Sequence, residues 1–374
     1  MIRRRRRMAK IALVSDVHLG TRQYGLKERY EDFLSSFEKF GKRVSSMNDV
    51  DAVVIGGDLF DSPRPDAHSV LVAQEVVSRI SDEGKVVFGI DGNHDLSGGD
   101  WMGVIGATPL PDMMPISFKG VKIVGVNYRS GRDFVSALQQ MVDMGVHADI
   151  LVAHFALAEM NGGGSSDTGV QEMYPFLKKM DVKCVLMGHV HIPDCREWNG
   201  VLFVNPGSTE MRSVNEPKEK VFYVVDTETW EAEHVQLETR KVEEVEISSE
   251  EDLVDFQMEL ENDAKTRANI VNCPQRTFYQ IIMDDSIDDA FKRLSKTIHD
   301  TSTIARIVMR SNRARDLAPT VDARKESLNT LESAIEARFP KDSDEARLIL
   351  SMLRSPDPSS IHMIVEKFME GERT

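Results

Sequence analysis

This sequence is poor in cysteine and has no long apolar run. Its three cysteines form no C-x-x-C pair, so neither a zinc ribbon nor a dithiol redox site is expected. So few cysteines fit a reducing cytoplasm better than secretion. No stretch is long and apolar enough to cross a bilayer, and the first residues lack the apolar segment of a secretory signal. We therefore expect a cytoplasmic, globular protein without a membrane segment.

Positive charge is also scarce. Lysine and arginine number 46 against 61 acidic residues, which gives a formal net charge of −15. A surface that binds nucleic acid by broad cationic attraction is therefore not expected. The substrate is either small or neutral, or it is a nucleic acid. In the second case metal ions, a local basic patch or a partner subunit would supply the positive charge that binds it. The sequence has no G-x-x-x-x-G-K-[ST] loop, so any ATP hydrolysis would belong to a partner.

Apolar, β-rich runs alternate with helical patterns through the first half of the chain. Near-continuous apolar strands are typical of parallel-rich sheets that are covered on both faces. The predicted strands span residues 10–15, 51–57, 85–90, 149–153, 182–187, 201–204 and 221–225, with a hairpin at 116–118 and 121–126. The predicted helices span residues 28–47, 66–81, with Asp66 as the cap, and 133–144.

The 374 residues are too many for one ordinary core, and composition changes near Thr229. An acidic stretch at 243–252 leads into a predicted helix, and a strand–helix–strand pattern follows at 277–309. From about Asp322 the pattern is helical, with apolar faces that would pack on the rest or dock to a partner. The expected domains are a basic tail (1–9), a catalytic domain (10–229), an α/β capping domain (230–315) and C-terminal helices (316–374).

Five polar motifs directly follow predicted strands. They are Asp16-Val17-His18, Gly57-Asp58-Leu59-Phe60-Asp61, Gly92-Asn93-His94-Asp95, Ala153-His154-Phe155 and Gly188-His189-Val190-His191. Open α/β sheets place ligands at the carboxyl ends of strands, so we expect these side chains to converge. A lone histidine is more often structural, and we assign that role to His68, His147, His234, His299 and His362.

Together the motifs offer ligands for two divalent metal ions. The candidates are Asp16, His18, Asp58, Asn93, His154, His189 and His191. Asp16 and His18 are two apart, so both can reach one ion. Asp58 has two oxygens and can bridge two ions. Oxygen and nitrogen ligands without a thiolate favour Mn²⁺, with Fe²⁺ or Zn²⁺ as alternatives.

Such a pair of ions predicts hydrolysis of a phosphoester. Two metals roughly 3.5–4 Å apart can bind a phosphate and activate a water in line with the leaving group. His94, next to Asn93, is the candidate general acid for the leaving oxygen, because an imidazole titrates near neutral pH. A carboxylate would orient it, and Asp61 is the first candidate and Asp95 the second.

The five motifs, in this order, resemble those of the calcineurin-like metallophosphoesterases over roughly residues 10–210. The resemblance implies an α/β fold: a four-layer sandwich of two mixed sheets flanked by helices, then a small α/β cap and a C-terminal helical segment. It implies one ion held by Asp16, His18, Asp58 and His191, and a second held by Asp58, Asn93, His154 and His189. His94 matches the catalytic acid, and Asp61 occupies the position of its usual orienting partner.

Within that superfamily the chain is most similar to SbcD-type DNA double-strand-break repair nuclease subunits, including phage relatives. The similarity rests on Asp16-Val17-His18-Leu19-Gly20, on Pro63-Arg64-Pro65 and on Asn205-Pro206-Gly207-Ser208-Thr209. It implies a metal-dependent DNA exonuclease or endonuclease that forms a homodimer, with residues 28–47 and 66–81 as candidate contacts. Its last helices would dock on an SbcC-like coiled-coil ATPase. Several family members have a histidine where Asp61 stands, which leaves open the preference between exonuclease and endonuclease.

Two other functions are compatible with the motifs. The chain could be a stand-alone phosphodiesterase or phosphatase for a small molecule or a phosphoprotein. The negative net charge favours this alternative, whereas the cap and the helical tail do not. A non-enzymatic scaffold would need the metals to be lost, yet every expected ligand position is filled.

Overall fold

The computed structural model describes residues 9–96, 99–160, 167–213, 215–268, 276–284, 287 and 289–310. The predicted basic tail, apart from Ala9, and the predicted C-terminal helices from residue 316 lie outside these residues, as do Cys273 and His362. Among the described helices, none combines the length and the apolar character needed to span a bilayer. Cys184 is buried and Cys195 is partly buried, and both are free thiols.

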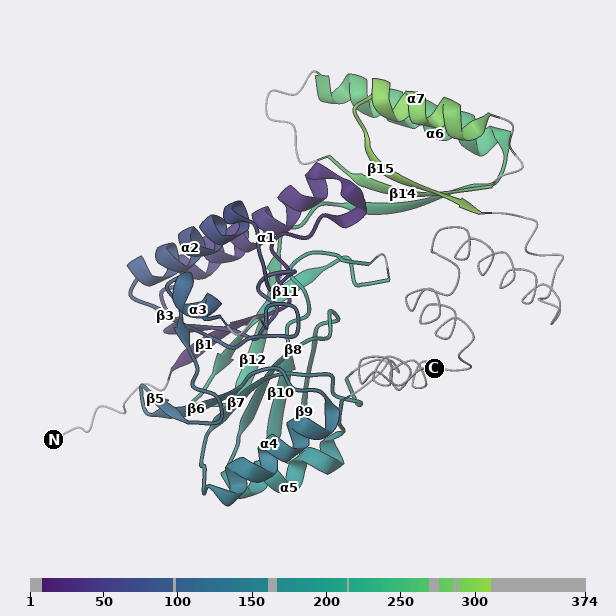
Figure 1. Ribbon diagram of the computed structural model, residues 1–374. Coiled ribbons are helices and arrows are strands. Elements are labelled where there is room, and N and C mark those ends of the chain that lie inside the picture. Colours follow the sequence, from purple (N-terminus) through teal and green to yellow (C-terminus); the bar gives the residue numbers. More distant parts are fainter. Residues whose placement is uncertain are drawn as a thin grey trace, which may run out of the picture.

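The first sheet lies beneath two long helices (Figure 1). Its strand order is β12-β11-β1-β2-β3-β4. The strands β1 to β4 run parallel to one another, β11 runs antiparallel to β1, and β12 runs antiparallel to β11. The strands are β1 (Lys10–Val14), β2 (Ala52–Ile55), β3 (Val86–Gly89), β4 (Thr108–Pro109), β11 (Lys220–Asp226) and β12 (Glu231–Leu237). The covering helices are α1 (Lys27–Ser45) and α2 (Ala67–Asp82), with the short η1 (Gln23–Gly25) and α3 (Trp101–Val104) nearby. Phe37, Phe40 and Val76 lie in the core between these layers.

The second sheet packs against the first and carries its own helices on the far side (Figure 1). Its order is β5-β6-β7-β8-β10-β9. The strands are β5 (Ile116–Phe118), β6 (Val121–Val126), β7 (Ile150–His154), β8 (Cys184–Gly188), β9 (Asp194–Trp198) and β10 (Val201–Asn205), and the helices are α4 (Gly131–Asp143) and α5 (Val170–Met180). Ile11, Val54, Ile123 and Leu186 share one apolar cluster between the sheets. The expected four-layer sandwich of two mixed sheets is therefore confirmed.

A smaller unit follows the sandwich. It is a parallel sheet of β13 (Val242–Ile247), β14 (Phe278–Asp284) and β15 (Ile304–Arg310), with α6 (Glu250–Ala268) and α7 (Ala290–Asp300). The helices lie side by side over the sheet, and Leu253 and Leu294 are buried in its core (Figure 1). Tyr24 of the sandwich stacks on Phe278 at a ring distance of 5.7 Å, which brings this unit against the loop after β1.

Several elements differ from those expected from the sequence. The acidic stretch at 243–252 leads into a helix, α6, as expected, but residues 242–247 form the unexpected strand β13, in which Val242 and Ile247 are buried. The first sheet continues beyond Thr229, because β12 pairs with β11 along its whole length. Neither α5, which contains Pro175, nor the largely polar β9 was expected from the sequence pattern. In β9, β12 and β13 many side chains are polar and lie exposed at a sheet surface, so these segments lack the apolar pattern from which a strand is predicted.

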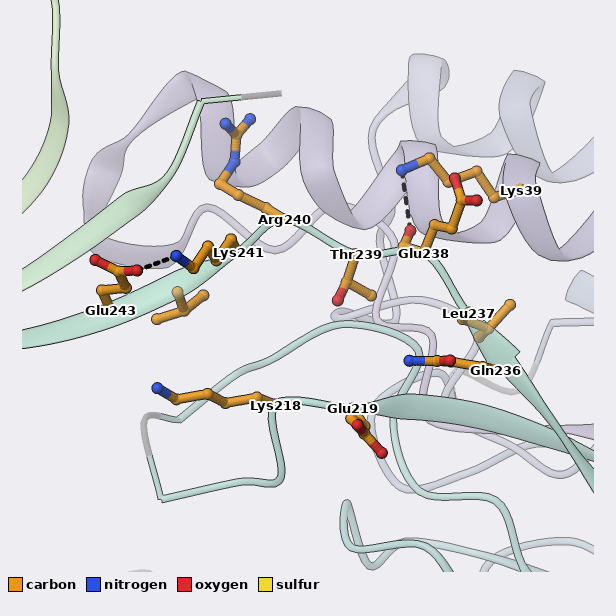
Figure 2. Close-up of a pocket in the computed structure, with 11 residues that line it drawn as sticks. Lys39, Lys218, Glu219, Gln236, Leu237, Glu238, Thr239, Arg240, Lys241 and Glu243 are labelled. Atoms are coloured by element: carbon orange, nitrogen blue, oxygen red, sulfur yellow. Dashed lines mark hydrogen bonds and ion pairs between the residues drawn. The ribbon is translucent and has the colours of Figure 1, made fainter. Parts of the chain in front are cut away.

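A recess of about 860 Å³ lies where the segment between β12 and β13 passes α1 (Figure 2). Lys39 donates to the Glu238 carbonyl at 2.9 Å across it. Its other lining residues are Lys218, Glu219, Gln236, Leu237, Thr239, Arg240, Lys241, Val242 and Glu243. None of the predicted metal ligands lines this recess, so it is separate from the cluster described next.

Candidate metal centre

The predicted ligands come from strand ends in both sheets. Asp16 and His18 follow β1, Asp58 follows β2 and Asn93 follows β3, all in the first sheet. In the second sheet, His154 is the last residue of β7, and His189 and His191 follow β8. The carboxyl ends of these parallel strands meet at one edge of the sandwich, so residues from five motifs converge.

One group of ligand atoms gathers around His18. Ligand atoms of Asp16, His18 and His191 lie within 4.8 Å of one another. The Nε2 atoms of His18 and His191 are 3.1 Å apart, and His191 Nε2 is 3.6 Å from Asp16 Oδ1. Asp58 Oδ2 lies 3.8 Å from His18 Nε2. These are the four side chains that the resemblance assigns to the first ion.

A second group gathers around Asn93. Its Oδ1 lies 3.1 Å from His154 Nε2 and 2.9 Å from His189 Nδ1. Asp58 Oδ2 is 3.3 Å from His154 Nε2, and ligand atoms of Asp58, His154 and His189 all lie within 4.8 Å of one another. Asp58 therefore faces both groups, as a bridging carboxylate must.

Left-handed backbone conformations occur at four of the seven candidates. The φ angles are 52° at Asp16, 51° at His18, 51° at Asp58 and 92° at His189. Such angles are sparsely populated by residues other than glycine and persist only where the surroundings impose them. The Asp16 N–H donates to the Gly57 carbonyl and the His18 N–H to the Asp58 carbonyl, which ties the first two loops together.

The Gly92–Asp95 loop packs directly on Asp58. A Cβ at Gly92 would lie 2.1 Å from Asp58 Oδ1, so only glycine fits there. The buried Asp95 carboxylate accepts from the N–H groups of Leu59 at 2.7 Å and Gly92 at 2.6 Å. Asp95 therefore fastens two loops and does not orient His94, so this second candidate from the sequence was wrong.

Contacts of the outer ring nitrogens aim the histidines at the centre. His154 Nδ1 lies 2.8 Å from the Gly56 carbonyl, and His191 Nδ1 lies 2.9 Å from Glu216 Oε1. A donor bound in this way keeps Nε2 facing the cluster. His18 Nδ1 lies 3.5 Å from the Asp61 carboxylate. Oriented imidazoles, carboxylates and an amide oxygen form a donor set that fits two divalent cations.

Asp58 and His154 each stabilise the charged form of the other. Burial would raise the pKa of Asp58, but the hydrogen bond and charge of His154 hold that pKa well below its ordinary value. Burial would lower the pKa of His154, but the hydrogen bond to Asp58, with the charges of Asp16 and Asp58, raises it to about 9. In contrast, burial lowers the pKa values of His18 and His189.

His94 stands at the rim of the cluster, with 32% of its side chain exposed. Its ring lies edge-on to that of His18 at 4.8 Å, and its Nδ1 is 3.1 Å from the Asp61 carbonyl. The Asp61 carboxylate is farther from His94, at 3.9 Å, than from His18, at 3.5 Å. Asp61 thus holds His94 mainly through its main chain. A nitrogen of His94 also lies within 4.8 Å of ligand atoms of His18 and Asp58, so a ligand role is geometrically open.

Two residues at the site, Arg212 and Glu216, were not identified from the sequence. Arg212 Nη1 lies 3.3 Å from His18 Nε2, and its Nη2 lies 2.9 Å from Asp61 Oδ1. Glu216 binds His191 and also Lys220, at 2.7 Å, and these two partners lower its pKa to about 2 although burial would raise it. Both residues follow the Asn205–Thr209 turn, and their closeness to this motif is the sequence feature that could have indicated them.

The histidines without a partner motif lie outside the ligand groups. Within the part of the chain that the structure describes, His68, His147, His234 and His299 belong to none of them. His147 is exposed and pairs with Asp181 at 3.0 Å. These histidines are useful controls.

Residues 9–230 match the family model for the calcineurin-like phosphoesterase superfamily domain. The chain is also similar to proteins named DNA double-strand break repair protein Mre11. The protein from Haloferax volcanii is 31% identical over 230 residues, covering 59% of this chain and 49% of that protein. The protein from Archaeoglobus fulgidus is 27% identical over 281 residues, covering 64% and 62%. This chain thus spans only about half to three-fifths of these two relatives.

The similarity to a third protein of that name extends over more of the chain. The protein from Methanocaldococcus jannaschii is 22% identical over 374 residues, covering 91% of this chain and 93% of that protein. Among solved structures, TT1561 of Thermus thermophilus is 13% identical with a TM-score of 0.43, covering 61% of this chain and 99% of that chain.

Proposed function

This chain belongs to the calcineurin-like phosphoesterase superfamily, and on that premise we propose that it hydrolyses the phosphodiester bonds of DNA. The observation that carries the proposal is the convergence of seven candidate ligand side chains, Asp58 among them, from five strand ends. His94 stands at the rim of this cluster, partly open to solvent.

The proposed ligand sets follow the two groups of side chains. Asp16, His18, Asp58 and His191 would hold one divalent ion, and Asp58, Asn93, His154 and His189 the other. When bound, such ions supply the polarisation of a phosphate group and the activation of a water. We favour manganese, with iron or zinc as alternatives.

The step that the ions do not supply, protonation of the leaving oxygen, is assigned to His94. As the water gives up a proton to solvent and its oxygen joins phosphorus, the bond from phosphorus to the leaving 3′ oxygen breaks, and the leaving oxygen needs a proton. In this proposal His94 Nε2 donates it, because the Asp61 carbonyl accepts from the other ring nitrogen and holds the ring at the rim. The exposed position of His94 suits a group that meets the substrate rather than the protein core.

DNA as the substrate and a partner ATPase complete the proposal. Support comes from the SbcD-like motifs and from the relatives whose names specify DNA double-strand break repair. A partner of the SbcC type would supply part of the positive field that this acidic chain lacks. A homodimer through α1 and α2 is part of the same proposal.

The direct test is a substrate panel with manganese-loaded protein. We expect cleavage of linear and hairpin DNA and little turnover of cyclic nucleotides or phosphopeptides. Asp58→Ala should lose both bound manganese and turnover, because this residue faces both ligand groups. Turnover of the small substrates with inert DNA would instead identify a stand-alone phosphodiesterase or phosphatase.

The partner is tested separately. Co-purification with an SbcC-like coiled-coil ATPase should succeed with the full chain and fail after deletion of the residues beyond about Asp322. The shortened chain should keep its basal manganese-dependent hydrolysis. An intact complex after the deletion would refute the docking role of that segment.

A further inference from the structure

Arg212 brings a positive charge to the metal centre, and none of the proposed catalytic steps uses it. Its side chain is 27% exposed, so it lies neither in the core nor free in solvent. We propose that Arg212 binds the non-bridging oxygens of the substrate phosphate at this centre. This assignment rests on the proposed function and adds a substrate-binding residue to it.

The contact with His18 puts the guanidinium on the ligand side of that ring. His18 Nε2, which accepts from Arg212 Nη1 at 3.3 Å, is the nitrogen that faces His191 at 3.1 Å and Asp58 at 3.8 Å. One lone pair cannot bind a cation and accept this hydrogen bond together. Loading of the centre therefore frees donors of Arg212, while the ion pair with Asp61 at 2.9 Å keeps the guanidinium beside the site.

Buried polar contacts fix the backbone that carries Arg212. Arg29, which is 1% exposed, donates to the Met211 carbonyl at 2.8 Å and to the Glu210 carboxylate at 3.2 Å. Gln23 Nε2 donates to the Arg212 carbonyl at 2.5 Å, and Gln23 Oε1 accepts from Arg29 at 2.8 Å. Because the main chain is held, only the side chain of Arg212 must be ordered when a ligand binds, which favours affinity.

The chemistry of the guanidinium suits this role. Arginine is always charged, and its planar fork of donors matches two oxygens of a phosphate. Two simpler roles predict different measurements. If Arg212 only neutralised Asp61, its loss would alter stability but not phosphate binding. If it only supported His18, its loss would weaken metal binding.

Calorimetry on the full chain separates these roles without measuring turnover. Wild-type protein, Arg212→Gln and Arg212→Lys are titrated first with manganese and then with inorganic phosphate. We expect manganese affinity not to fall in either variant, since Arg212 is not a ligand and its hydrogen bond to His18 Nε2 competes with the ion. Phosphate affinity should fall about 10- to 100-fold in Arg212→Gln, as for loss of a hydrogen bond between charged groups. Arg212→Lys should lie between, because it keeps the charge without the fork.

The control is Arg43→Gln, which removes an exposed positive charge in the last turn of α1. It should leave phosphate affinity within about twofold of wild type, and an equal loss would show a long-range charge effect and overturn the assignment. Unchanged phosphate affinity in both Arg212 variants would also overturn it, as would a parallel loss of manganese affinity. Wild-type protein that takes up no manganese would defeat the proposed function, and this inference with it.

Discussion

His154 holds a proton that a bound cation would have to displace. Asp58 and Asp16 raise the pKa of this imidazole to about 9 although burial would lower it, whereas burial lowers the pKa values of His18 and His189. Near pH 7.5 the metal-free centre therefore has one charged imidazole among these three. Because a metal ligand must be deprotonated, we expect manganese binding to release about one proton at pH 7.5. Calorimetry in buffers of different ionisation enthalpy measures this number.

The direction of that pKa shift also gives the pH dependence. His154 is protonated in the free centre below about pH 9, so manganese affinity should fall as pH falls from 9 to 7. Asp58 adds nothing in this range, because its pKa is already well below its ordinary value. Equal affinity at pH 7 and pH 9, or no proton release at pH 7.5, would contradict the charged state assigned to His154.

His94→Ala separates a general acid from a metal ligand. As the acid, His94 should contribute about 10²- to 10⁴-fold to turnover while leaving the bound metal unchanged. Metal analysis of the purified variant, beside turnover of linear DNA, measures both properties. His147→Ala, which removes an exposed imidazole paired with Asp181, is the matched control and should behave as wild type. Turnover near the wild-type rate in His94→Ala would refute the acid, and loss of metal would identify a ligand.

The residues that the sequence could identify lie at the end of a strand or shortly after it. All seven candidate ligands lie in short motifs at strand ends, and the structure brings all seven together. Arg212 could not be found in this way, because its contact with His18 joins residues 194 positions apart. Asp95 was misjudged for a related reason, since its backbone partner Leu59 lies in another motif. Local pattern locates a motif, whereas the direction of each side chain depends on tertiary packing.

Elements were predictable where one face is uniformly apolar or a cap is explicit. The strands β1, β2 and β3 are buried along almost their whole length, and Asp66 caps α2 by accepting from the N–H groups of His68 and Ser69, as expected. The strand β12 was not predicted because it is an edge strand with mostly exposed side chains. The helix α5 was not predicted because it contains Pro175, and proline normally argues against a helix.

Gly92→Ala tests how tightly the β3 loop must approach Asp58. The added Cβ would lie 2.1 Å from Asp58 Oδ1 and 2.4 Å from its main-chain nitrogen, so the loop has to move. We expect manganese affinity to fall at least about tenfold and thermal stability to fall, because overpacking typically costs about 1–3 kcal/mol. Calorimetry and thermal unfolding measure the two effects.

Gly169→Ala is the matched control for that substitution. The residue precedes α5 with φ −118°, and its added Cβ would meet Glu159 at an ordinary 3.4 Å. This variant should bind manganese as the wild type does. If Gly92→Ala behaved in the same way, the loop would be more compliant than the close packing on Asp58 implies.

A buried ion cluster ties the smaller sheet unit to the sandwich and to the metal centre. Arg240, in the segment between β12 and β13, donates to both oxygens of Asp32 on α1, at 2.6 and 2.7 Å. Asp32 also accepts from Arg29 at 2.7 Å, and Arg29 reaches Glu210, two residues before Arg212. Two guanidinium groups thus depend on one buried carboxylate, which makes Asp32 the critical member of the cluster.

Asp32→Ala should therefore destabilise the whole molecule more than Arg240→Ala. Without Asp32, Arg29 keeps one carboxylate and Arg240 keeps none among the described residues, and an uncompensated buried charge costs about 3–5 kcal/mol. Without Arg240, Asp32 stays paired with Arg29, so the loss is smaller. Urea unfolding measures the order of the variants. Arg310→Ala removes an exposed ion pair with Glu246 and should change stability by less than about 0.5 kcal/mol. An Asp32→Ala protein as stable as this control would show that the cluster does not hold the two units together.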